Sequence, residues 1–233
     1  MYIEITNSGF KVIGKEPLKL NLKQLGIESF SFAISGLKYP IPNKKDTLFE
    51  TIKIKDGKVY NLEYHQKRVD FAYKNLFYKE SELKLQNTFK DIPQNGLFRA
   101  KIIYNKEGLI EYNYFKYKKK RISKIALVEL DLDYNYKYLD RSYFDMLFKK
   151  FDFDEFLITK NGYLTDTTIS NIALLNKNNT WHTPKEPLLR GTTRQRYIEA
   201  SKLIKKMIHY HNLKEYSKLA MLNAMIDFNI LGV

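Results

Sequence analysis

The sequence has no cysteine among its 233 residues. This absence excludes disulfide bonds, thiolate zinc sites and cysteine nucleophiles. The chain also has no run of eighteen uncharged apolar residues, which excludes a transmembrane helix. Its N-terminal residues lack an apolar segment after a basic start, so we expect no secretion signal. Together these absences predict a cytoplasmic protein that does not associate with membranes.

Arginine is scarce in a chain whose net charge is +14, because only seven of its forty basic residues are arginine. The others are lysines spread along the chain beside Asn, Tyr, Ile and Phe, all of which have AT-rich codons. The one dense basic run, Lys116–Arg121, lies between two strand-like segments and is interpreted as a solvated linker. The alternative is a non-enzymatic nucleic-acid-binding protein, with Tyr112–Lys120 as its exposed aromatic and basic strand.

The composition, 44% apolar and 28% charged, is typical of a globular protein. Alternating apolar residues and the pairs Asp56-Gly57 and Asn161-Gly162, which favour type I′ turns, predict hairpins. Asn61 is a candidate cap for the first long helix. We expect strands over 2–5, 11–13, 29–34, 48–55, 59–60, 98–104, 109–115, 122–132, 156–159, 163–164 and 172–175, and helices over 62–77, 143–151 and 192–208. This mixed α+β chain is divided at the basic run into domains 1–117 and 118–233.

Several common catalytic motifs are absent from the chain. It contains no G-x-x-x-x-G-K-[ST], G-x-G-x-x-G, H-E-x-x-H or G-x-S-x-G sequence. The four histidines, His65, His182, His209 and His211, are scattered rather than spaced as metal ligands. We therefore expect no metal site.

Three polar features stand where chemistry could occur. Lys137 lies between a predicted strand and a helix, and Asp166 directly follows a hairpin strand. Gly191-Thr192-Thr193-Arg194 opens a predicted helix, whose first N–H groups can bind a phosphate. A reactive amine, a carboxylate and a phosphate cradle are what pyridoxal 5′-phosphate requires. Each feature alone is weak, since a single lysine is usually a surface residue.

The order of further motifs strengthens this interpretation. They are Leu48-Phe-Glu-Thr-Ile52, His65-x-x-Arg68, Arg99, Lys137-Tyr-Leu-Asp-Arg141, Asp154-Glu-Phe-Leu-Ile158, Gly162-Tyr-Leu-Thr-Asp166, Ser170-Asn171, Trp181-His-Thr-Pro184, Pro187-Leu-Leu-Arg-Gly-Thr-Thr-Arg194 and Leu222-Asn-Ala-Met225. In this order the chain resembles the class IV pyridoxal-phosphate family of branched-chain and D-amino-acid aminotransferases. Within that family it is most similar to aminodeoxychorismate lyases.

The resemblance implies a two-domain fold with an N-terminal α/β sandwich and a C-terminal pseudo-barrel, pyridoxal 5′-phosphate as cofactor, and a homodimer. It implies that Lys137 is the Schiff-base lysine and the proton-transfer base. Asp166 stands where the family usually has Glu, and would pair with the pyridine nitrogen. The implied cofactor-binding residues are Lys137, Arg68, Asp166, Asn171, Thr192, Thr193 and Asn223.

The same resemblance separates phosphate, substrate and supporting residues. Arg68 would bind the phosphate together with Thr192 and Thr193, and Arg99 would bind a substrate carboxylate. Asn171 would support the site, and Asn223 would border the cofactor. Glu50, in the strand expected over 48–55, is interpreted as structural, and His65 as a packed or capping histidine.

One segment departs from the family pattern. The family usually has a D-R-G-x-x-x-G-D-G-like stretch before the F-E-T segment, whereas this chain has Leu37–Asp46 without that pattern. Residues 1–36 match nothing in the family. These differences concern the loop on the substrate side.

The resemblance predicts a lyase that converts 4-amino-4-deoxychorismate to 4-aminobenzoate and pyruvate, a step of folate biosynthesis. An aminodeoxychorismate synthase would supply the substrate. The alternative is a transaminase acting on branched-chain or D-amino acids, with 2-oxoglutarate as the amino acceptor. A transaminase must leave its cofactor aminated after half a cycle, and a lyase does not.

Overall fold

The computed structural model describes residues 1–19 and 47–232, which form two compact units. The small unit is the described part of Pro42–Lys119 together with Tyr136–Asp140. The large unit is formed by the rest of the described chain. The strand expected over 29–34 and the atypical segment Leu37–Asp46 lie outside the described residues.

The chain passes from the small to the large unit at Lys119, close to the predicted boundary after residue 117. The N-terminal strands, however, do not belong to the small unit. Tyr2 and Ile3 pair with Ala126 and Ile125 in an antiparallel ladder, which places them in the large unit. A single division at residue 117 is therefore wrong for these strands, because it assigns them to the N-terminal domain.

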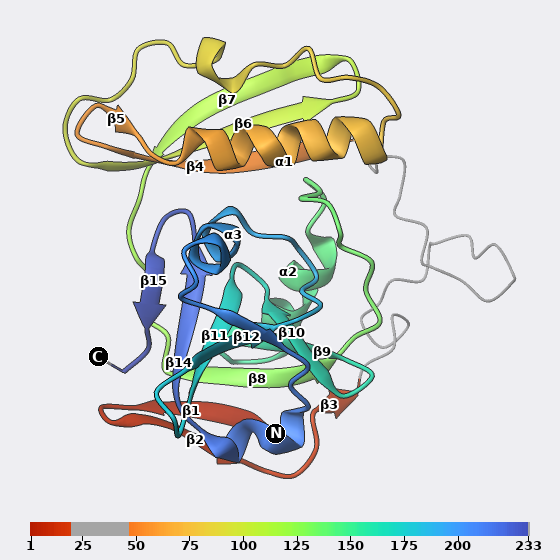
Figure 1. Cartoon of the computed structure of the whole chain (residues 1–233), viewed down its shortest axis with the longest axis vertical. Helices are drawn as coiled ribbons and strands as arrows, with labels where there is room; N and C mark the ends of the chain where they lie inside the picture. The colour runs from red at the N-terminus through yellow and green to blue at the C-terminus, as the bar shows by residue number, and fades with distance from the viewer. Residues whose placement is uncertain (20–46, 233) are drawn as a thin grey trace, which may run out of the picture. The chain divides into compact units, whose positions relative to one another are not determined.

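The small unit is a four-stranded antiparallel sheet in the order β5-β4-β6-β7, with a helix along one face (Figure 1). Alternation explains the packing, because Ile52 and Ile54 of one strand and Ile102 of the next are fully buried on the helix side. The elements are β4 (Leu48–Lys55), β5 (Lys58–Val59), α1 (Leu62–Asn75), η2 (Leu85–Asn87), β6 (Leu97–Asn105) and β7 (Gly108–Lys116).

The turn between β4 and β5 has the predicted type I′ character, since Asp56 and Gly57 both have positive φ, 48° and 76°. The predicted cap of α1 is wrong in its chemistry. Asn61 has a left-handed backbone, φ 53°, and makes no side-chain hydrogen bond to the helix. Asn tolerates this conformation better than most residues, so Asn61 serves as a turn residue before α1.

The large unit is built on an eleven-stranded sheet, counted over the described residues, whose longest path is β13-β12-β11-β10-β9-β8-β1-β2. Most neighbouring strands are antiparallel, and β8–β9, β3–β8 and β12–β13 are parallel. The strands are β1 (Tyr2–Thr6), β2 (Gly9–Ile13), β3 (Leu18–Lys19), β8 (Lys124–Glu129), β9 (Glu155–Lys160), β10 (Tyr163–Thr167), β11 (Asn171–Asn176), β12 (Trp181–Pro184), β13 (Ile204–Lys206), β14 (Tyr216–Asn223) and β15 (Asp227–Ile230).

The curled sheet of the large unit encloses an apolar core to which strands from the whole unit contribute (Figure 1). Ile3, Leu127, Leu157, Ile172 and Met221 are completely buried in it. The N-terminal strand is therefore part of this core, which explains why β1 groups with strands more than a hundred residues later.

The helices of the large unit are α2 (Ser142–Lys150), α3 (Thr192–Glu199) and the short η3 (Tyr210–Glu215). α2 confirms the helix expected over 143–151. The helix expected over 192–208 is wrong after Glu199, because Ser201 takes a left-handed φ of 57° and Ile204–Lys206 then pair with β12. No helix in the described segments is long and apolar enough to cross a membrane.

Candidate active site

A buried ion cluster lies between β4 and α1 of the small unit. Glu50 is completely buried on the same sheet face as the apolar residues of β4. Its Oε2 accepts hydrogen bonds from His65 Nδ1 at 2.6 Å and Arg68 Nη2 at 2.5 Å, and its Oε1 accepts one from Arg68 Nε at 2.8 Å. His65 and Arg68 are three positions apart in the helix, so both lie on the same side of α1. One strand carboxylate therefore holds two helix side chains in place.

The charges of this cluster are set by its geometry. Burial by itself would raise the pKa of Glu50, but the Arg68 guanidinium and the hydrogen bonds from His65 and Arg68 lower it to about 2. Burial lowers the pKa of His65 below its usual value, against the opposing effect of Glu50. Glu50 is thus an anion and His65 a neutral imidazole at neutral pH, with its Nδ1–H donated to the carboxylate.

Lys137 lies on the segment Tyr136–Asp140, which is attached to the start of β4. Its carbonyl accepts a hydrogen bond from Phe49 N at 2.9 Å, and Leu139 N donates to Thr47 O at 2.9 Å. The Lys137 ammonium lies 4.4 Å from the centre of the Phe49 ring. Its charge also contributes to lowering the pKa of His65. The small unit therefore brings together two predicted site residues, Lys137 and Arg68, around the Glu50–His65 pair.

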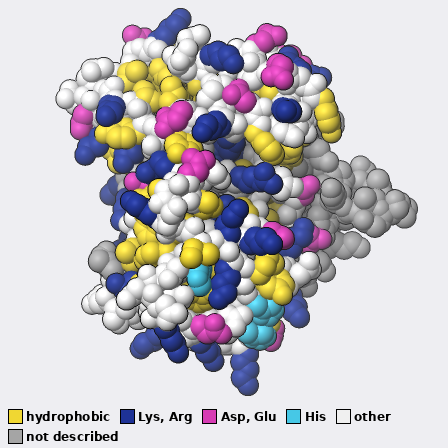
Figure 2. Space-filling model, viewed as in Figure 1, with side chains coloured by type: hydrophobic (Ala, Val, Ile, Leu, Met, Phe, Trp, Pro, Cys, Tyr) yellow, Lys and Arg dark blue, Asp and Glu magenta, His cyan; other side chains and the backbone are white. Residues whose placement is uncertain are grey.

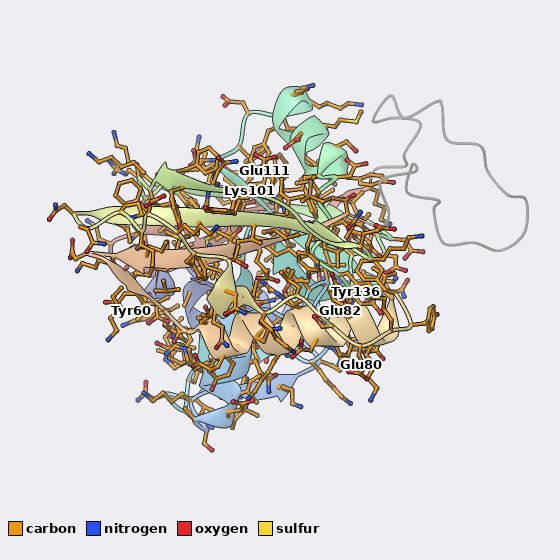
Figure 3. The ribbon with its side chains drawn as sticks, turned by 90° about the horizontal axis from the view of Figure 1, so that it is seen from above. Tyr60, Glu80, Glu82, Lys101, Glu111 and Tyr136 are labelled. Carbon is orange, nitrogen blue, oxygen red and sulfur yellow. The ribbon has the colours of Figure 1, made fainter. Side chains whose placement is uncertain are left out.

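Arg99 lies on the opposite face of the same sheet. It lies two residues before Lys101 in β6 and so on the same face, and Figure 3 shows Lys101 and Glu111 on the sheet face away from α1. The Arg99 guanidinium lies 5.1 Å from the centre of the Phe115 ring. Its Nε atom is buried, and no described residue accepts a hydrogen bond from it. The sheet therefore separates Arg99 from Arg68, and the structure does not bring these two predicted site residues together.

The large unit holds the predicted carboxylate in a network of neutral donors. Asp166, at 4% exposed, lies on β10 opposite Asn171, the first residue of β11. Its Oδ1 accepts a hydrogen bond from Asn171 Nδ2 at 2.7 Å, and its Oδ2 accepts one from the backbone N–H of Leu189 at 2.8 Å. Asn171 Nδ2 also donates to the Leu189 carbonyl at 2.9 Å. Asp166 and Asn171 therefore act on the same loop.

Burial raises the pKa of Asp166 to about 7, although the hydrogen bonds from Leu189 and Asn171 and the more distant charge of Arg194 act in the other direction. No described residue makes a salt bridge to this carboxylate. A cation placed beside Asp166 would be balanced by an anion that lacks a charged partner of its own. That property suits the pairing with a pyridinium nitrogen predicted for Asp166.

The start of α3 packs directly against Asn171. A Cβ atom on Gly191 would lie 1.9 Å from Asn171 Oδ1, so only glycine allows this approach. Thr192 and Thr193, the next two residues, are buried at the N-terminus of the eight-residue helix. The large unit therefore places the predicted phosphate-binding residues beside the predicted carboxylate.

Arg194 fixes the direction of α3. Its Nη2 donates to the Pro184 carbonyl at 2.7 Å, and its Nε donates to Thr183 Oγ1 at 3.1 Å. These bonds tie the first turn of α3 to the end of β12.

Asn223 is a turn residue in the structure. Its Oδ1 accepts hydrogen bonds from Met225 N at 2.9 Å and Ile226 N at 3.0 Å, which shapes the turn between β14 and β15. Its Nδ2 donates to Ile169 O at 3.3 Å, in the loop that precedes Asn171. Asn223 thus connects the C-terminal turn to the β10–β11 loop.

Comparison with known proteins shows to which family the chain belongs. Residues 135–230 match the family model of class IV amino-transferases. An uncharacterized protein of Haemophilus influenzae is 34% identical over 185 residues, which are 76% of this chain and 97% of that protein. A crystal structure from Haemophilus somnus, described as a "putative 4-amino-4-deoxychorismate lyase", is 32% identical, covers 78% of this chain and 97% of its own, and has a TM-score of 0.67. The chain belongs to the class IV aminotransferase family.

A more distant class IV-like fold covers nearly the whole chain. The pyridoxal-phosphate-bound form of a hypothetical aminotransferase from Mycobacterium tuberculosis is 14% identical, covers 98% of this chain and 89% of its own, and has a TM-score of 0.64. The mixed α and β class IV fold expected from the sequence is thereby confirmed.

Glu50 and His65 have a more important role in the small unit than the sequence predicted. That interpretation makes Glu50 structural and His65 packed or capping, whereas the structure makes them the partners that hold Arg68 and each other. The signal in the sequence is the position of Glu50, a charged residue on the inward-facing side of an otherwise apolar strand.

A further buried carboxylate supports the β10–β11 loop. Glu155 Oε1 accepts a hydrogen bond from Thr168 Oγ1 at 2.5 Å, and Arg141 Nη2 donates to the Thr168 carbonyl at 2.7 Å. Burial raises the pKa of Glu155 above its usual value. Thr168 is thus held at both its hydroxyl and its carbonyl, which fixes the loop between Asp166 and Asn171.

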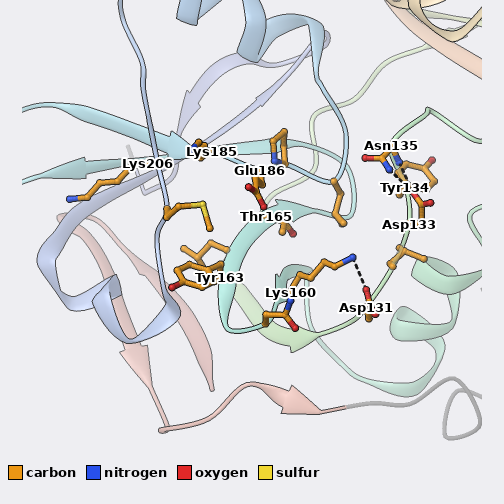
Figure 4. A pocket seen from close by; sticks show the side chains of 16 residues that line it. Asp131, Asp133, Tyr134, Asn135, Lys160, Tyr163, Thr165, Lys185, Glu186 and Lys206 are labelled. Atoms are coloured by element: carbon orange, nitrogen blue, oxygen red, sulfur yellow. Dashed lines mark hydrogen bonds and ion pairs between the residues drawn. The ribbon is translucent and has the colours of Figure 1, made fainter. Parts of the chain in front are cut away.

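A cavity of about 750 Å³ lies elsewhere on the large unit (Figure 4). Its walls come from the segments 131–135 and 160–165, from 185–188, and from Lys206 and Met207. Lys160 and Asp131 form an ion pair of 2.6 Å at its edge. None of the eight predicted site residues lines it. Thr165 shares β10 with Asp166, but its hydroxyl is used by the Ile158 carbonyl.

The strand named in the nucleic-acid alternative is β7. Tyr112 and Tyr114 contact each other edge to face there, and the Tyr114 hydroxyl donates to the Lys90 carbonyl. Figure 2 shows Lys and Arg side chains scattered among acidic and apolar ones on the visible face.

In the described segments, no three acidic, His or Cys side chains are grouped as metal ligands.

Proposed function

We propose that this class IV protein is a pyridoxal-phosphate-dependent lyase that converts 4-amino-4-deoxychorismate to 4-aminobenzoate and pyruvate. The lyase described from Haemophilus somnus supports this choice, because it is 32% identical over almost its entire length. The single observation that supports a cofactor of this kind most is the position of Lys137, an amine attached to β4 near the Glu50–His65–Arg68 cluster.

The residues present fit pyridoxal 5′-phosphate in each unit. In the small unit, the amine of Lys137 would hold the aldehyde carbon, and Arg68 would bind the phosphate. The small unit also has a buried nitrogen, His65 Nε2, with no hydrogen-bond partner among the described residues. When bound, the cofactor supplies the electron sink that stabilises negative charge on the substrate carbon.

In the large unit, Asp166 would pair with the pyridine nitrogen, and Asn171 and Leu189 N–H would hold its carboxylate in place. Thr192 and Thr193 would contribute hydroxyl and backbone N–H groups to the phosphate. The role proposed for Asn223 is to keep the C-terminal turn closed against the β10–β11 loop. A carboxylate with neutral partners is well suited to keep a neighbouring ring nitrogen protonated.

Different residues of the chain would then carry out the proton transfer and bind the substrate. The Lys137 amine takes the proton from the substrate carbon that bears nitrogen. The bond between the ring carbon and the enolpyruvyl oxygen breaks, enolpyruvate leaves and takes up a proton to become pyruvate, and the ring becomes aromatic. Arg99 would bind a carboxylate of the substrate. The balance closes without an amino acceptor, since all atoms of the substrate appear in the two products.

The second candidate is a transaminase on branched-chain or D-amino acids. The Mycobacterium tuberculosis aminotransferase shares the fold, and Lys137 could move a proton between two carbons as readily as remove one. The distinguishing requirement is a second substrate, an oxo acid that takes the amino group.

The test is a product assay with 4-amino-4-deoxychorismate and no oxo acid. The proposal expects 4-aminobenzoate and pyruvate in equal amounts over many turnovers. Absence of both products, with bleaching of the cofactor band on adding D- or branched-chain amino acids, would replace the lyase by the transaminase.

Two further proposals concern partners. We expect a homodimer, which sedimentation velocity of the purified protein would test. We also expect that an aminodeoxychorismate synthase supplies the substrate, and a coupled assay would test this.

A further inference from the structure

The buried cluster of the small unit has no net positive charge. Glu50 is ionised and its charge is balanced by Arg68, which it binds through two hydrogen bonds of 2.8 and 2.5 Å. His65 is buried as a neutral ring, at 1% exposed. A phosphate ester carries a charge between about −1.5 and −2 at pH 7. An arginine already neutralised by a buried carboxylate compensates such an anion poorly.

His65 is the member of this cluster whose charge can change near neutral pH. Its Nδ1–H is donated to Glu50, which fixes the orientation of the ring. Its other nitrogen, Nε2, is buried and finds no hydrogen-bond partner in the described chain. Buried ring nitrogens normally have a partner, since a buried polar atom without one loses the hydrogen bonds it made to water. Nε2 therefore indicates a ligand contact.

We propose that His65 is a second ligand of the cofactor phosphate and takes up a proton at Nε2 when the phosphate binds, with Glu50 as the positioning residue for both His65 and Arg68. The proposal rests on the proposed function only for the identity of the phosphate ester. The proton comes from solvent and no covalent bond changes. The protonated Nε2–H then donates to a phosphate oxygen, while Nδ1–H continues to donate to Glu50.

The groups that face His65 explain why the phosphate decides its charge. Glu50 on β4 favours the protonated ring, whereas Arg68 on α1 and Lys137 on the segment attached to β4 oppose it, as burial does. Tyr104 on β6 adds no charge, because burial raises its pKa well above the usual value. Without a ligand these influences leave the ring neutral. A dianion adds the attraction that favours the imidazolium.

The consequence is a pH-dependent affinity for the phosphate group. Between the pKa of His65 in the free protein and its higher pKa in the complex, affinity for a phosphate dianion rises as the pH falls, by up to about tenfold per pH unit. For a ligand with the same pyridine ring but no phosphate, the affinity should not depend on the protonation of His65.

Titration calorimetry with pyridoxine 5′-phosphate and with pyridoxine measures this proton uptake directly. Pyridoxine 5′-phosphate and pyridoxine share one ring, differ in the phosphate, and cannot react with Lys137, so the result does not depend on the lyase reaction. Titrations near pH 8 in two buffers of different protonation enthalpy count the protons taken up. We expect the phosphate ester to take up about one proton more than pyridoxine, and ³¹P NMR to show the bound phosphate as a dianion.

The matched variants are His65→Asn and His182→Asn. In His65→Asn the new amide keeps a donor for Glu50 but cannot be protonated, so the extra proton should disappear and the affinity for the ester should fall at least about tenfold, with that for pyridoxine unchanged. His182, buried in the large unit beside Tyr216, is the control, and its replacement should keep the extra proton. Glu50→Gln should reduce the extra proton uptake with the ester, because the carboxylate that favours the protonated His65 ring is removed.

Several results would overturn the proposal. They are an extra proton that persists in His65→Asn, a bound phosphate that is a monoanion, and no binding of the ester at all. If His65→Asn does not fold, as judged by its thermal unfolding, the wild-type comparison still decides, because equal proton uptake with both alcohols contradicts the proposal. A protein that shows the extra proton but makes no 4-aminobenzoate would refute the lyase and leave His65 in its role.

Discussion

Asp166 should make the cofactor-free protein less stable as the pH rises. Burial raises the pKa of this carboxyl from 3.8 to about 7. A pKa difference of one corresponds to about 1.4 kcal/mol, so ionising Asp166 costs the folded state roughly 4 kcal/mol in total. An acid with a raised pKa binds its proton more tightly when folded. Stability therefore falls as the pH rises from 3.8 to about 7, and is level above that.

The perturbation that tests this is Asp166→Asn, which keeps the shape and removes the charge. Asn can still accept the Leu189 N–H, but its amide faces that of Asn171, which costs about 1 kcal/mol. The variant's stability relative to wild type should therefore rise by roughly 2 kcal/mol between about pH 5.5 and pH 8.5, the part of the transition that lies in this window.

Urea unfolding of both cofactor-free proteins at the two pH values measures this change. Other titrating groups, Glu155 among them, contribute equally to both proteins and cancel in the difference. An identical pH dependence in wild type and variant would show that the carboxyl of Asp166 titrates normally, and the account of its burial would then be incorrect. With cofactor added, the variant should bind but react slower by several powers of ten, because the electron sink loses its anion.

Three further predictions concern other parts of the site. Glu50→Gln should lower the free energy of unfolding at pH 7 by about 3–5 kcal/mol, because a buried ion pair loses its carboxylate, and urea unfolding measures this; wild type should lose this contribution only in acid, as the pH falls from 4.5 through about 2. Lys137→Ala should abolish the visible absorption band of the lysine-bound cofactor without unfolding the protein, and an unchanged band would contradict its role. Gly191→Ala should destabilise by about 1–3 kcal/mol in urea and much less when it is combined with Asn171→Ala, since the clash is with that amide; equal losses in both backgrounds would contradict the contact.

Local patterns predicted most of the strands in this fold. The hairpin β4–β5 and the helix α1 follow from alternation, from the Asp56-Gly57 turn and from a three-to-four-residue apolar spacing. The helix expected over 192–208 failed because its second half satisfies its backbone against β12, in a parallel pairing that no local spacing predicts. The prediction that β1 belongs to the N-terminal domain was wrong for a related reason, since its partner β8 is more than a hundred residues away in the sequence.

The candidate site was predicted through its order of motifs rather than through the chemistry of single residues. Asp166 and Asn171 were identified as candidates, but their shared contact with Leu189 depends on a loop that arrives from a later segment. The role of His65 could not be predicted, because its place in the cluster depends on a strand carboxylate fifteen residues earlier. A sequence shows the residue types, and their partners follow only from the fold.

The two central carboxylates show how partners decide the use of a buried acid. Glu50 and Asp166 are almost equally buried, yet their pKa values lie near 2 and near 7. Glu50 is paired with a guanidinium and a ring N–H, so its charge is permanent and its use is to hold cationic side chains. Among its described partners, Asp166 accepts hydrogen bonds only from neutral groups, so its negative charge is not balanced and can pair with a cation that binds beside it. Exchanging the acids' partners, rather than the acids, would exchange these properties.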